Sequence, residues 1–348
     1  MIRVLIVEDS PVVQALLDHI LSSDPEIHVI GTASNGAEAL GLLKRMKPDI
    51  ITMDIHMPEM NGYEAIRRIM ETHPVPIVIV SAGYNQEDLE QTFRALEAGA
   101  VAVVEKPAGV EHPGFENVAK KLIETVKLMS EVKVVRRWSR LRRADTGASR
   151  PGLTLKQRPG DIKCVAIGAS TGGPPVLQTV LSRLSKDFSA PIFIVQHIAA
   201  GFLQGLVDWL RQATGLPVHI ASQGESPLPG HVYFAPDGFQ MGVDSGGRIA
   251  LRKEQQGNGL CPSASYLFRS VAEVFGPYAV GVLLTGMGND GAEGLKLMKE
   301  KGAVTIAQDK DSSVVHGMPG EAIKLGAATY VLTPERIAIT LERLASKK

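Results

Sequence analysis

The chain has 348 residues, of which 44% are hydrophobic and 21% charged, and its 37 basic and 37 acidic residues give a formal net charge of zero. This composition excludes a disordered chain and a nucleic-acid-binding protein that is strongly basic throughout. The length suggests two domains, each large enough to bury its own core.

The first 125 residues alternate short apolar runs with segments of helical periodicity. Continuous Val/Ile-rich runs separated by helices indicate a parallel sheet covered on both faces. Five such units predict a flavodoxin-like, doubly wound α/β domain, whose ligands lie outside the carboxyl ends of the strands. The five apolar runs are 2–7, 27–33, 49–53, 76–80 and 101–104.

Polar residues follow these runs where the strands are predicted to end. They are Glu8, Asp9, Asp54, Ser81 and Lys106. Three carboxylates at one sheet edge repel one another unless a cation lies among them, and oxygen ligands suit Mg²⁺. Each acid taken singly is also explained as a helix N-cap, as Asp9 before SPVV would be, but that alternative does not account for the whole set.

With Pro107 after Lys106, this set resembles the phosphoacceptor site of response-regulator receiver domains. The resemblance implies that Asp54 accepts a phosphoryl group from a histidine kinase and that Ser81 and Lys106 contact the phosphoryl oxygens. Receivers usually carry Tyr or Phe three residues before the lysine, where this chain has Val103. That departure puts the usual aromatic-rotamer switch in question, but not phosphorylation itself.

The same resemblance implies a Mg²⁺ site. Asp9, Asp54 and the backbone carbonyl of His56 would hold the ion, and Glu8 would act mainly through water. A metal ion and an ammonium group together neutralise the charge that develops during phosphoryl transfer.

Charge is distributed unevenly along the chain. Residues 1–130 contain 11 basic and 19 acidic residues, residues 131–160 contain 9 and 2, and residues 161–348 contain 17 and 16. The basic stretch has no strong apolar period and ends in DTGASRPG, which is typical of a linker. We therefore predict a receiver domain at 1–125, a basic linker at 126–160 and a second domain at 161–348.

The second half has the same alternation of apolar runs and helical segments. It predicts a second α/β domain with a largely parallel sheet. Its apolar runs are 162–167, 191–196, 231–235, 278–284 and 303–307.

The first of these runs leads directly into GASTGGPPVL. Its residues 168–172 fit the pattern G-x-S-x-G between a strand and a helix, where small residues allow a sharp turn that presents the Ser170 hydroxyl above the sheet. Amides at the start of the following helix suit an oxyanion at the same place. The alternatives are a plain glycine-rich turn or a phosphate-binding loop, although neither Gly-Lys-Ser/Thr nor G-x-G-x-x-G is present.

A serine nucleophile needs a base, and the base needs an acid that orients it. His197 ends the run 191–196, beside Ser170 if sequential strands are neighbours, and Asp290 follows a later run in the glycine-rich segment LLTGMGNDG. Asp290 is equally explained as a helix N-cap. The chain order Ser-His-Asp differs from that of α/β-hydrolases, which predicts a separate fold with a convergent triad. Less favoured histidines are His219, His231 and His316.

With GASTGG, IVQH and LLTGMGNDGAEG in place, the second half resembles the catalytic domain of chemotaxis protein-glutamate methylesterases, and the likeness extends through PSASYLFRSVAE and SVVHGMPGEAI. A receiver that precedes this domain is the family's own arrangement. The resemblance implies hydrolysis of γ-glutamyl methyl esters on methyl-accepting chemoreceptors, with deamidation of receptor glutamines and no cofactor for the esterase. It also implies a triad of Ser170, His197 and Asp290, with the amides of Thr171 and Met287 as oxyanion donors.

Two departures from that family, Asp237 in APDGF and the string CPSAS, are expected to bear on substrate contact. We also expect the unphosphorylated receiver to cover the triad and phosphorylation of Asp54 to relieve this. Two rival hypotheses are a DNA-binding regulator that uses the Arg-rich linker, and a binding module that uses GASTGG without chemistry. A flexible connector, or one that complements the acidic receiver, explains the linker better, so no nucleic-acid partner is expected.

The sequence also favours a cytoplasmic location. Cys164 and Cys261 are too few for a disulfide framework and too far apart for a zinc motif, so both thiols are expected to be buried in a reducing compartment. The N-terminus becomes acidic within eight residues, and no apolar run approaches the roughly 18 residues of a membrane span. Neither a signal peptide nor membrane insertion is expected.

Overall fold

The computed structural model describes residues 1–82, 86–109, 112, 114–132, 134, 162–253 and 260–346, with the backbone alone for residues 86–90. The chain divides into two compact units, Met1–Gly152 and Leu153–Lys348. Most of the predicted linker 126–160 lies outside the described residues, so its boundaries stay a prediction. None of the described helices is long and apolar enough to cross a membrane.

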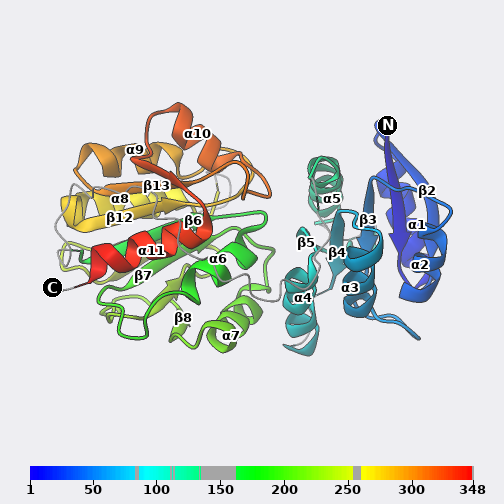
Figure 1. Ribbon diagram of the computed structural model, residues 1–348, viewed down its shortest axis with the longest axis horizontal. Coiled ribbons are helices and arrows are strands. Elements are labelled where there is room, and N and C mark those ends of the chain that lie inside the picture. The colour runs from blue at the N-terminus through cyan, green and yellow to red at the C-terminus, as the bar shows by residue number, and fades with distance from the viewer. Residues whose placement is uncertain are drawn as a thin grey trace, which may run out of the picture. The chain divides into compact units, whose positions relative to one another are not determined.

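The N-terminal unit is a five-stranded parallel sheet in the order β2-β1-β3-β4-β5, with helices on both faces (Figure 1). This confirms the flavodoxin-like fold predicted from the alternating apolar runs. The strands are β1 (Ile2–Val7), β2 (Ile27–Ala33), β3 (Ile50–Met53), β4 (Ile77–Ser81) and β5 (Ala102–Glu105). One face carries α1 (Pro11–Ser22) and α5 (Phe115–Ser130), and the other carries α2 (Gly36–Leu43), α3 (Gly62–Thr72) and α4 (Gln86–Ala98).

The local sequence explains where these elements begin and how they are buried. All residues of β3 and β4 are buried, because helices cover both faces of the central strands. The N-cap of α1 is Ser10, whose hydroxyl accepts from the amide of Val13. The alternative that Asp9 caps this helix is therefore wrong, and the Asp9 carboxylate remains exposed at the end of β1.

The C-terminal unit contains a seven-stranded parallel sheet in the order β14-β13-β12-β6-β7-β9-β8 and a separate antiparallel hairpin, β10–β11. This confirms the second, largely parallel α/β domain. The five predicted strands are β6 (Cys164–Ala169), β7 (Ile192–Gln196), β9 (Val232–Phe234), β12 (Ala279–Leu283) and β13 (Val304–Gln308). The sequence analysis missed β8 (Val218–Ile220), β10 (Phe239–Val243), β11 (Ile249–Lys253) and β14 (Tyr330–Leu332).

Helices cover both faces of this sheet as well (Figure 1). One face carries α8 (Ala264–Phe275), α9 (Ala292–Glu300) and α10 (Met318–Lys324). The short 3₁₀ helix η1 (Gly276–Tyr278) joins α8 to β12. The other face carries α6 (Gly173–Leu181), α7 (Leu203–Thr214) and α11 (Pro334–Ala345).

The strand order reverses at β6. From β6 the chain adds β7, β8 and β9 on one side of the sheet, and later adds β12, β13 and β14 on the other side. In open α/β sheets, ligands bind at the carboxyl ends of the strands at such a reversal. The end of β6 is therefore the favoured place for a site in this unit.

The two cysteines differ in their surroundings. Cys164 lies in β6 and is fully buried, and burial raises the pKa of its thiol above the ordinary value. Cys261 is only half-buried, so the expectation that both thiols are buried is wrong for this residue. The reason is its place in the loop that leads into α8 rather than in a strand.

Candidate functional site

Ser170 lies directly after β6, in the turn that leads into α6. Gly172 ends this turn with φ +76°, a left-handed conformation that favours glycine, and an added Cβ there would lie 2.5 Å from Cβ of Val314. The Ser170 amide donates to the carbonyl of Thr285, at 3.0 Å. The serine is therefore held at the point of strand reversal, with 9% of its surface exposed.

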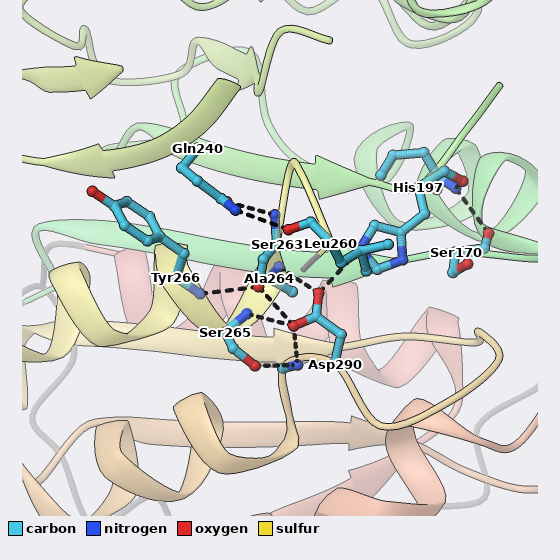
Figure 2. A network of polar contacts seen from close by, with 11 residues as sticks. Ser170, His197, Gln240, Leu260, Ser263, Ala264, Ser265, Tyr266 and Asp290 are labelled. Carbon is cyan, nitrogen blue, oxygen red and sulfur yellow. Dashed lines mark hydrogen bonds and ion pairs between the residues drawn. The ribbon is translucent and has the colours of Figure 1, made fainter. Parts of the chain in front are cut away.

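His197 follows β7, which pairs directly with β6 as the sequence analysis expected. Its amide donates to the carbonyl of Ala169 at 2.9 Å, and the buried Gln196 amide group donates to the carbonyls of Ser170 and His197, each at 2.8 Å. Its ring Nε2 lies 3.0 Å from Oδ2 of Asp290. Figure 2 shows the ring between Asp290 and Ser170, with the second ring nitrogen on the side of the serine.

No hydrogen bond joins the Ser170 hydroxyl to His197 within the described part of the chain. In free hydrolases such bonds are often long and tighten only when substrate binds. The three side chains still lie in the order Asp290, His197, Ser170, which is the order that an acid, a base and a nucleophile would need.

The Asp290 carboxylate is saturated with hydrogen-bond donors (Figure 2). Burial raises the pKa of Asp290, but hydrogen bonds from His197, Ser263 and Ser265 outweigh burial and hold this pKa well below its ordinary value. The N-cap of α9 is Gly291 rather than Asp290, so the N-cap alternative is wrong. The five donors are His197 Nε2, Ser263 Oγ and the amides of Ala264, Ser265 and Gly291.

The other candidate histidines have different partners. His219 and His231 pair with each other through ring nitrogens 2.9 Å apart, with stacked rings. His316 forms a backbone bridge with Gly286, and its ring nitrogen Nδ1 lies 3.3 Å from the hydroxyl of Ser313. Among the described histidines, His197 is therefore the one that pairs with Asp290.

Two backbone amides beside Ser170 are free of protein acceptors. Within the described residues, neither the Thr171 amide nor the Met287 amide donates a hydrogen bond. Amides that lie beside a serine and have no protein acceptor are available to an oxyanion. Thr285 links the two segments, because its hydroxyl lies 3.0 Å from the Thr171 carbonyl and accepts from the Val315 amide at 2.9 Å.

The N-terminal unit also collects its predicted residues at one sheet edge. Carboxylate oxygens of Glu8, Asp9 and Asp54 lie within 4.8 Å of one another. Lys106 Nζ lies 2.8 Å from Asp54 Oδ2 and 2.9 Å from Glu8 Oε2. Burial lowers the pKa of Lys106, but the two carboxylates outweigh burial and raise that pKa above its ordinary value.

Glu8 is incompletely compensated. It is 1% exposed, and its Oε2 is close to the Lys106 ammonium but has no hydrogen bond of good alignment. Burial raises the pKa of Glu8, and the charge of Asp54 adds to this rise while Lys106 opposes it. A buried carboxylate oxygen that has an ion pair but no hydrogen bond, among three carboxylates, fits a divalent cation.

The remaining predicted residues lie around this cluster. Ser81 ends β4 and is buried, with its hydroxyl 3.5 Å from that of Thr92 on α4. His56 is exposed two residues after Asp54. Val103 lies half-buried in β5. The proposed ligand role of the His56 carbonyl and the phosphoryl contacts of Ser81 and Lys106 stay predictions.

Two family models match different parts of the chain. A family model described as CheB methylesterase matches residues 165–341, and one described as response regulator receiver domain matches residues 4–112. The chain is 57% identical to the protein-glutamate methylesterase/protein-glutamine glutaminase of Nitrosospira multiformis, over all of this chain and 98% of that protein. A protein of the same name, numbered 4, from Geobacter metallireducens is 55% identical over the full length of both chains.

Among solved structures, the Thermotoga maritima CheB methylesterase catalytic domain is 39% identical, with a TM-score of 0.51, and the match covers 53% of this chain and 98% of that one. The chain belongs to the CheB methylesterase family. It is therefore a hydrolase that also carries a response-regulator receiver domain, which confirms the resemblance drawn from the sequence.

In this methylesterase, the sequence analysis missed the residues that hold the Asp290 carboxylate. Ser263 precedes α8 and is its N-cap, a role visible in the string PSAS, but its contact with Asp290 depends on how α8 meets the end of β12. The expectation that CPSAS bears on substrate contact is thus incomplete, because two of its serines contact Asp290 or its neighbour. Asp237 accepts from the Gly201 amide at 3.1 Å.

Proposed function

We propose that the C-terminal unit hydrolyses γ-glutamyl methyl esters on methyl-accepting chemoreceptors and deamidates receptor glutamines. The observation that carries this proposal is the His197–Asp290 pair at 3.0 Å beside Ser170, at the strand reversal of a chain from the methylesterase family. The relatives named protein-glutamate methylesterase/protein-glutamine glutaminase supply the substrate class.

In the first step, the Ser170 hydroxyl attacks the ester carbonyl and His197 takes the hydroxyl proton. Because Nε2 of His197 is bound to Asp290, the proton is accepted at Nδ1, the nitrogen on the serine side (Figure 2). Asp290 then stabilises the imidazolium without accepting its proton. The depressed pKa of Asp290 suits this role, since the carboxylate stays ionised.

The tetrahedral intermediate carries a negative oxygen, which the amides of Thr171 and Met287 bind. Its collapse breaks the bond to the leaving group, and the proton on His197 passes to methanol from an ester or to ammonia from an amide. Water, activated by the same imidazole, then releases the glutamate carboxylate from Ser170.

In the receiver, we propose that Asp54 accepts a phosphoryl group from a histidine kinase. Glu8, Asp9, Asp54 and the His56 carbonyl would hold Mg²⁺, which when bound neutralises negative charge on the phosphoryl oxygens. Lys106 already lies 2.8 Å from Asp54 and is placed to bind the same oxygens, and Ser81 is expected to contact them from the end of β4.

The regulatory part of the proposal is that the unphosphorylated receiver restrains the esterase and that phosphorylation of Asp54 releases it. A small acyl phosphate should raise methanol release by the full chain, and Asp54→Asn should abolish the rise but keep the basal rate. An equal rise in the variant would contradict this regulation.

The chemistry is tested by methanol release from membranes that contain methylated chemoreceptors. Ser170→Ala should lower the rate by a factor on the order of 10⁶ and leave phosphorylation of Asp54 intact. Near-normal release by this variant would overturn the proposed nucleophile.

A binding module without chemistry is the main rival, and a serine-directed fluorophosphonate separates the two. Labelling of Ser170 that depends on His197 supports the hydrolase, whereas no labelling supports the binding module. For the rival that the linker binds DNA, a salt-dependent affinity for duplex DNA would revive the hypothesis.

A further inference from the structure

The Asp290 carboxylate is bound by the N-terminal end of α8, a helix that the triad itself does not include (Figure 2). Amides of Ala264 and Ser265 donate to it at 2.6 and 3.0 Å, and the hydroxyl of Ser263 donates at 2.8 Å. Oδ2 of the carboxylate has about two lone-pair directions, and it accepts from the Ala264 amide and pairs with His197. The end of α8 therefore sets which way the carboxylate faces.

The direction of the Ser263 hydroxyl proton follows from its two contacts. The Tyr266 amide lies 3.3 Å from this hydroxyl and can only donate to it. The hydroxyl therefore caps α8 as an acceptor and directs its own proton to Asp290 Oδ1. The Ser263 hydroxyl thus joins His197 as a side-chain donor to Asp290.

Gln240 fixes the position of Ser263 from the hairpin. Its side chain is 5% exposed and lies on β10, where Oε1 accepts from the Ser263 amide and Nε2 donates to the Leu260 carbonyl, each at 2.8 Å. If the oxygen and nitrogen of this side-chain amide were exchanged, its NH₂ group would face the Ser263 amide and its oxygen would face the Leu260 carbonyl, so neither hydrogen bond could form. One side chain thus holds both ends of the segment that places the Ser263 hydroxyl.

We infer that Ser263, supported by Gln240, is a positioning residue of the esterase, which fixes the Asp290 carboxylate toward His197 and limits how strongly it holds the imidazolium. The inference rests on the proposed function for the substrate, whereas the contacts among Gln240, Ser263 and Asp290 do not depend on it. The titratable side chain that bonds Asp290 in the described structure is His197, and the partners from α8 and from the turn before α9 are uncharged.

Ser263→Ala tests this inference in the full chain. Loss of the hydroxyl leaves the carboxylate less well compensated, so it binds the imidazolium more tightly while facing it less accurately. We expect kcat to fall about tenfold with little change in KM, and the acid limb of the kcat/KM profile to move up by roughly half a pH unit. Ser263→Thr, which keeps the hydroxyl, should restore both.

Ser270→Ala is the matched control. Ser270 lies on the same helix, where its hydroxyl donates to the Leu267 carbonyl at 2.9 Å and accepts from the Val243 amide at 3.2 Å, and it does not contact Asp290. This variant should lower the melting temperature but leave kcat and the acid limb unchanged. If Ser270→Ala shifted the acid limb as much as Ser263→Ala does, the inference would be overturned. It would also be overturned if Ser263→Ala left the acid limb unchanged.

A second variant and a second readout keep the outcome interpretable. Gln240→Met keeps the bulk of the side chain. It should change kcat and the acid limb in the same direction as Ser263→Ala, but by a smaller amount. If Gln240→Met changed neither, the inference would be contradicted even if Ser263→Ala does not fold. The rate of fluorophosphonate labelling at Ser170 against pH reports on the same imidazole without a receptor. If methylated receptors release no methanol with the unaltered chain, the proposed function fails, while the labelling profile still decides the role of Ser263.

Discussion

The receiver and the esterase both place carboxylates at the carboxyl ends of parallel strands, yet they compensate the charge with different groups. In the receiver, Glu8 and Asp54 share the single ammonium of Lys106, and one Glu8 oxygen keeps no aligned hydrogen bond. In the esterase, Asp290 receives donors at both oxygens from a helix terminus, a hydroxyl and an imidazole.

This difference separates a site suited to change from one suited to remain fixed. The ammonium of Lys106 is on a flexible stem and can turn to a new anion, so the receiver can exchange one set of charge partners for another. Backbone amides at the start of α8 cannot move away from Asp290 without unwinding the helix. The burial-driven rise in the pKa of Glu8 and the hydrogen-bond-driven fall in the pKa of Asp290 follow from these two designs.

Asp290→Asn should give the largest effect on catalysis. The amide offers one acceptor oxygen in place of two and favours the wrong imidazole tautomer, so kcat should fall about 10⁴-fold. Methanol release at saturating substrate measures the loss. Asp244→Asn, in the turn of the β10–β11 hairpin, is a control of the same chemistry and should retain activity. A fully active Asp290→Asn enzyme would remove this residue from the mechanism.

The same variant should have a pH-dependent stability. Because the pKa of Asp290 is depressed in the folded state, its carboxylate stabilises the fold above the unfolded-state pKa, and this contribution is lost as the pH falls through the lower native pKa. The difference in melting temperature between the unaltered chain and Asp290→Asn should be full above roughly pH 5 and shrink below it. A difference that grew on acidification would contradict the assigned direction.

Gly286→Ala should disturb the oxyanion side of the site. An added Cβ would lie 2.3 Å from Sδ of Met318 and 2.7 Å from Cβ of Ser170, so the segment that carries the Met287 amide has to shift. Loss of one oxyanion donor typically costs about 10²–10³ in kcat. Gly41→Ala on α2, where an added Cβ meets nothing within 4 Å, should leave esterase activity unchanged. Equal activities of the two variants would contradict the placement of the oxyanion amides.

Thr285→Val should give a smaller loss. The buried Thr285 hydroxyl joins the Thr171 and Val315 segments, and valine keeps the shape but leaves the Val315 amide unpaired, at a stability cost of about 1–3 kcal/mol. Relaxation of the Thr171 amide should lower kcat about tenfold. Thr305→Val on β13 removes a hydroxyl that is equally buried and donates to the Ala327 carbonyl. The Thr305→Val variant should be less stable but keep its kcat. If its kcat fell as much as that of Thr285→Val, the effect of Thr285→Val would follow from lost stability and not from the oxyanion site.

The strands were predictable wherever the sequence has a continuous apolar run between segments of helical periodicity. The five receiver strands and five strands of the second sheet follow from such runs. The strands β8, β9 and β14 have three residues each, but β9 is buried throughout, whereas β8 and β14 are partly exposed strands at the two edges of the sheet. In the β10–β11 hairpin, β10 is buried after its first residue and β11 changes from buried at Ile249 to exposed at Arg252 and Lys253, so neither strand alternates between buried and exposed residues.

The site was predictable where it depends on strand ends. Ser170, His197 and Asp290 each follow a predicted parallel strand, and parallel strands bring their carboxyl ends to one edge. The contacts of Ser263 and Gln240 were not predictable, because they depend on which strand end α8 meets and on the path of a hairpin that lies outside the main sheet. Local patterns identify Ser263 as a helix cap but say nothing of the carboxylate it reaches.

Lys106→Met addresses the receiver side of the comparison. Removing the ammonium leaves Glu8 and Asp54 as buried charges without a cation, at a cost on the order of 3 kcal/mol, and Mg²⁺ should replace part of the lost compensation. Hydrogen exchange of the β1 and β3 amides, in chelator and in millimolar Mg²⁺, measures this for the receiver alone. Lys127→Met removes a more exposed ion pair with Asp24 and Glu26, so it should cost less stability than Lys106→Met and add no Mg²⁺ response.

The esterase distinguishes the two designs in this last experiment. Because Asp290 is compensated by groups of the fold, chelator should not change the basal rate of methanol release by the unaltered chain. A larger Mg²⁺ gain in Lys106→Met than in the unaltered chain supports a receiver site that depends on an exchangeable cation. If Mg²⁺ stabilised Lys106→Met and the unaltered chain equally, Lys106 and the metal would compensate different charges. The receiver and the Asp290 site would then differ only in the type of group that donates to the carboxylates.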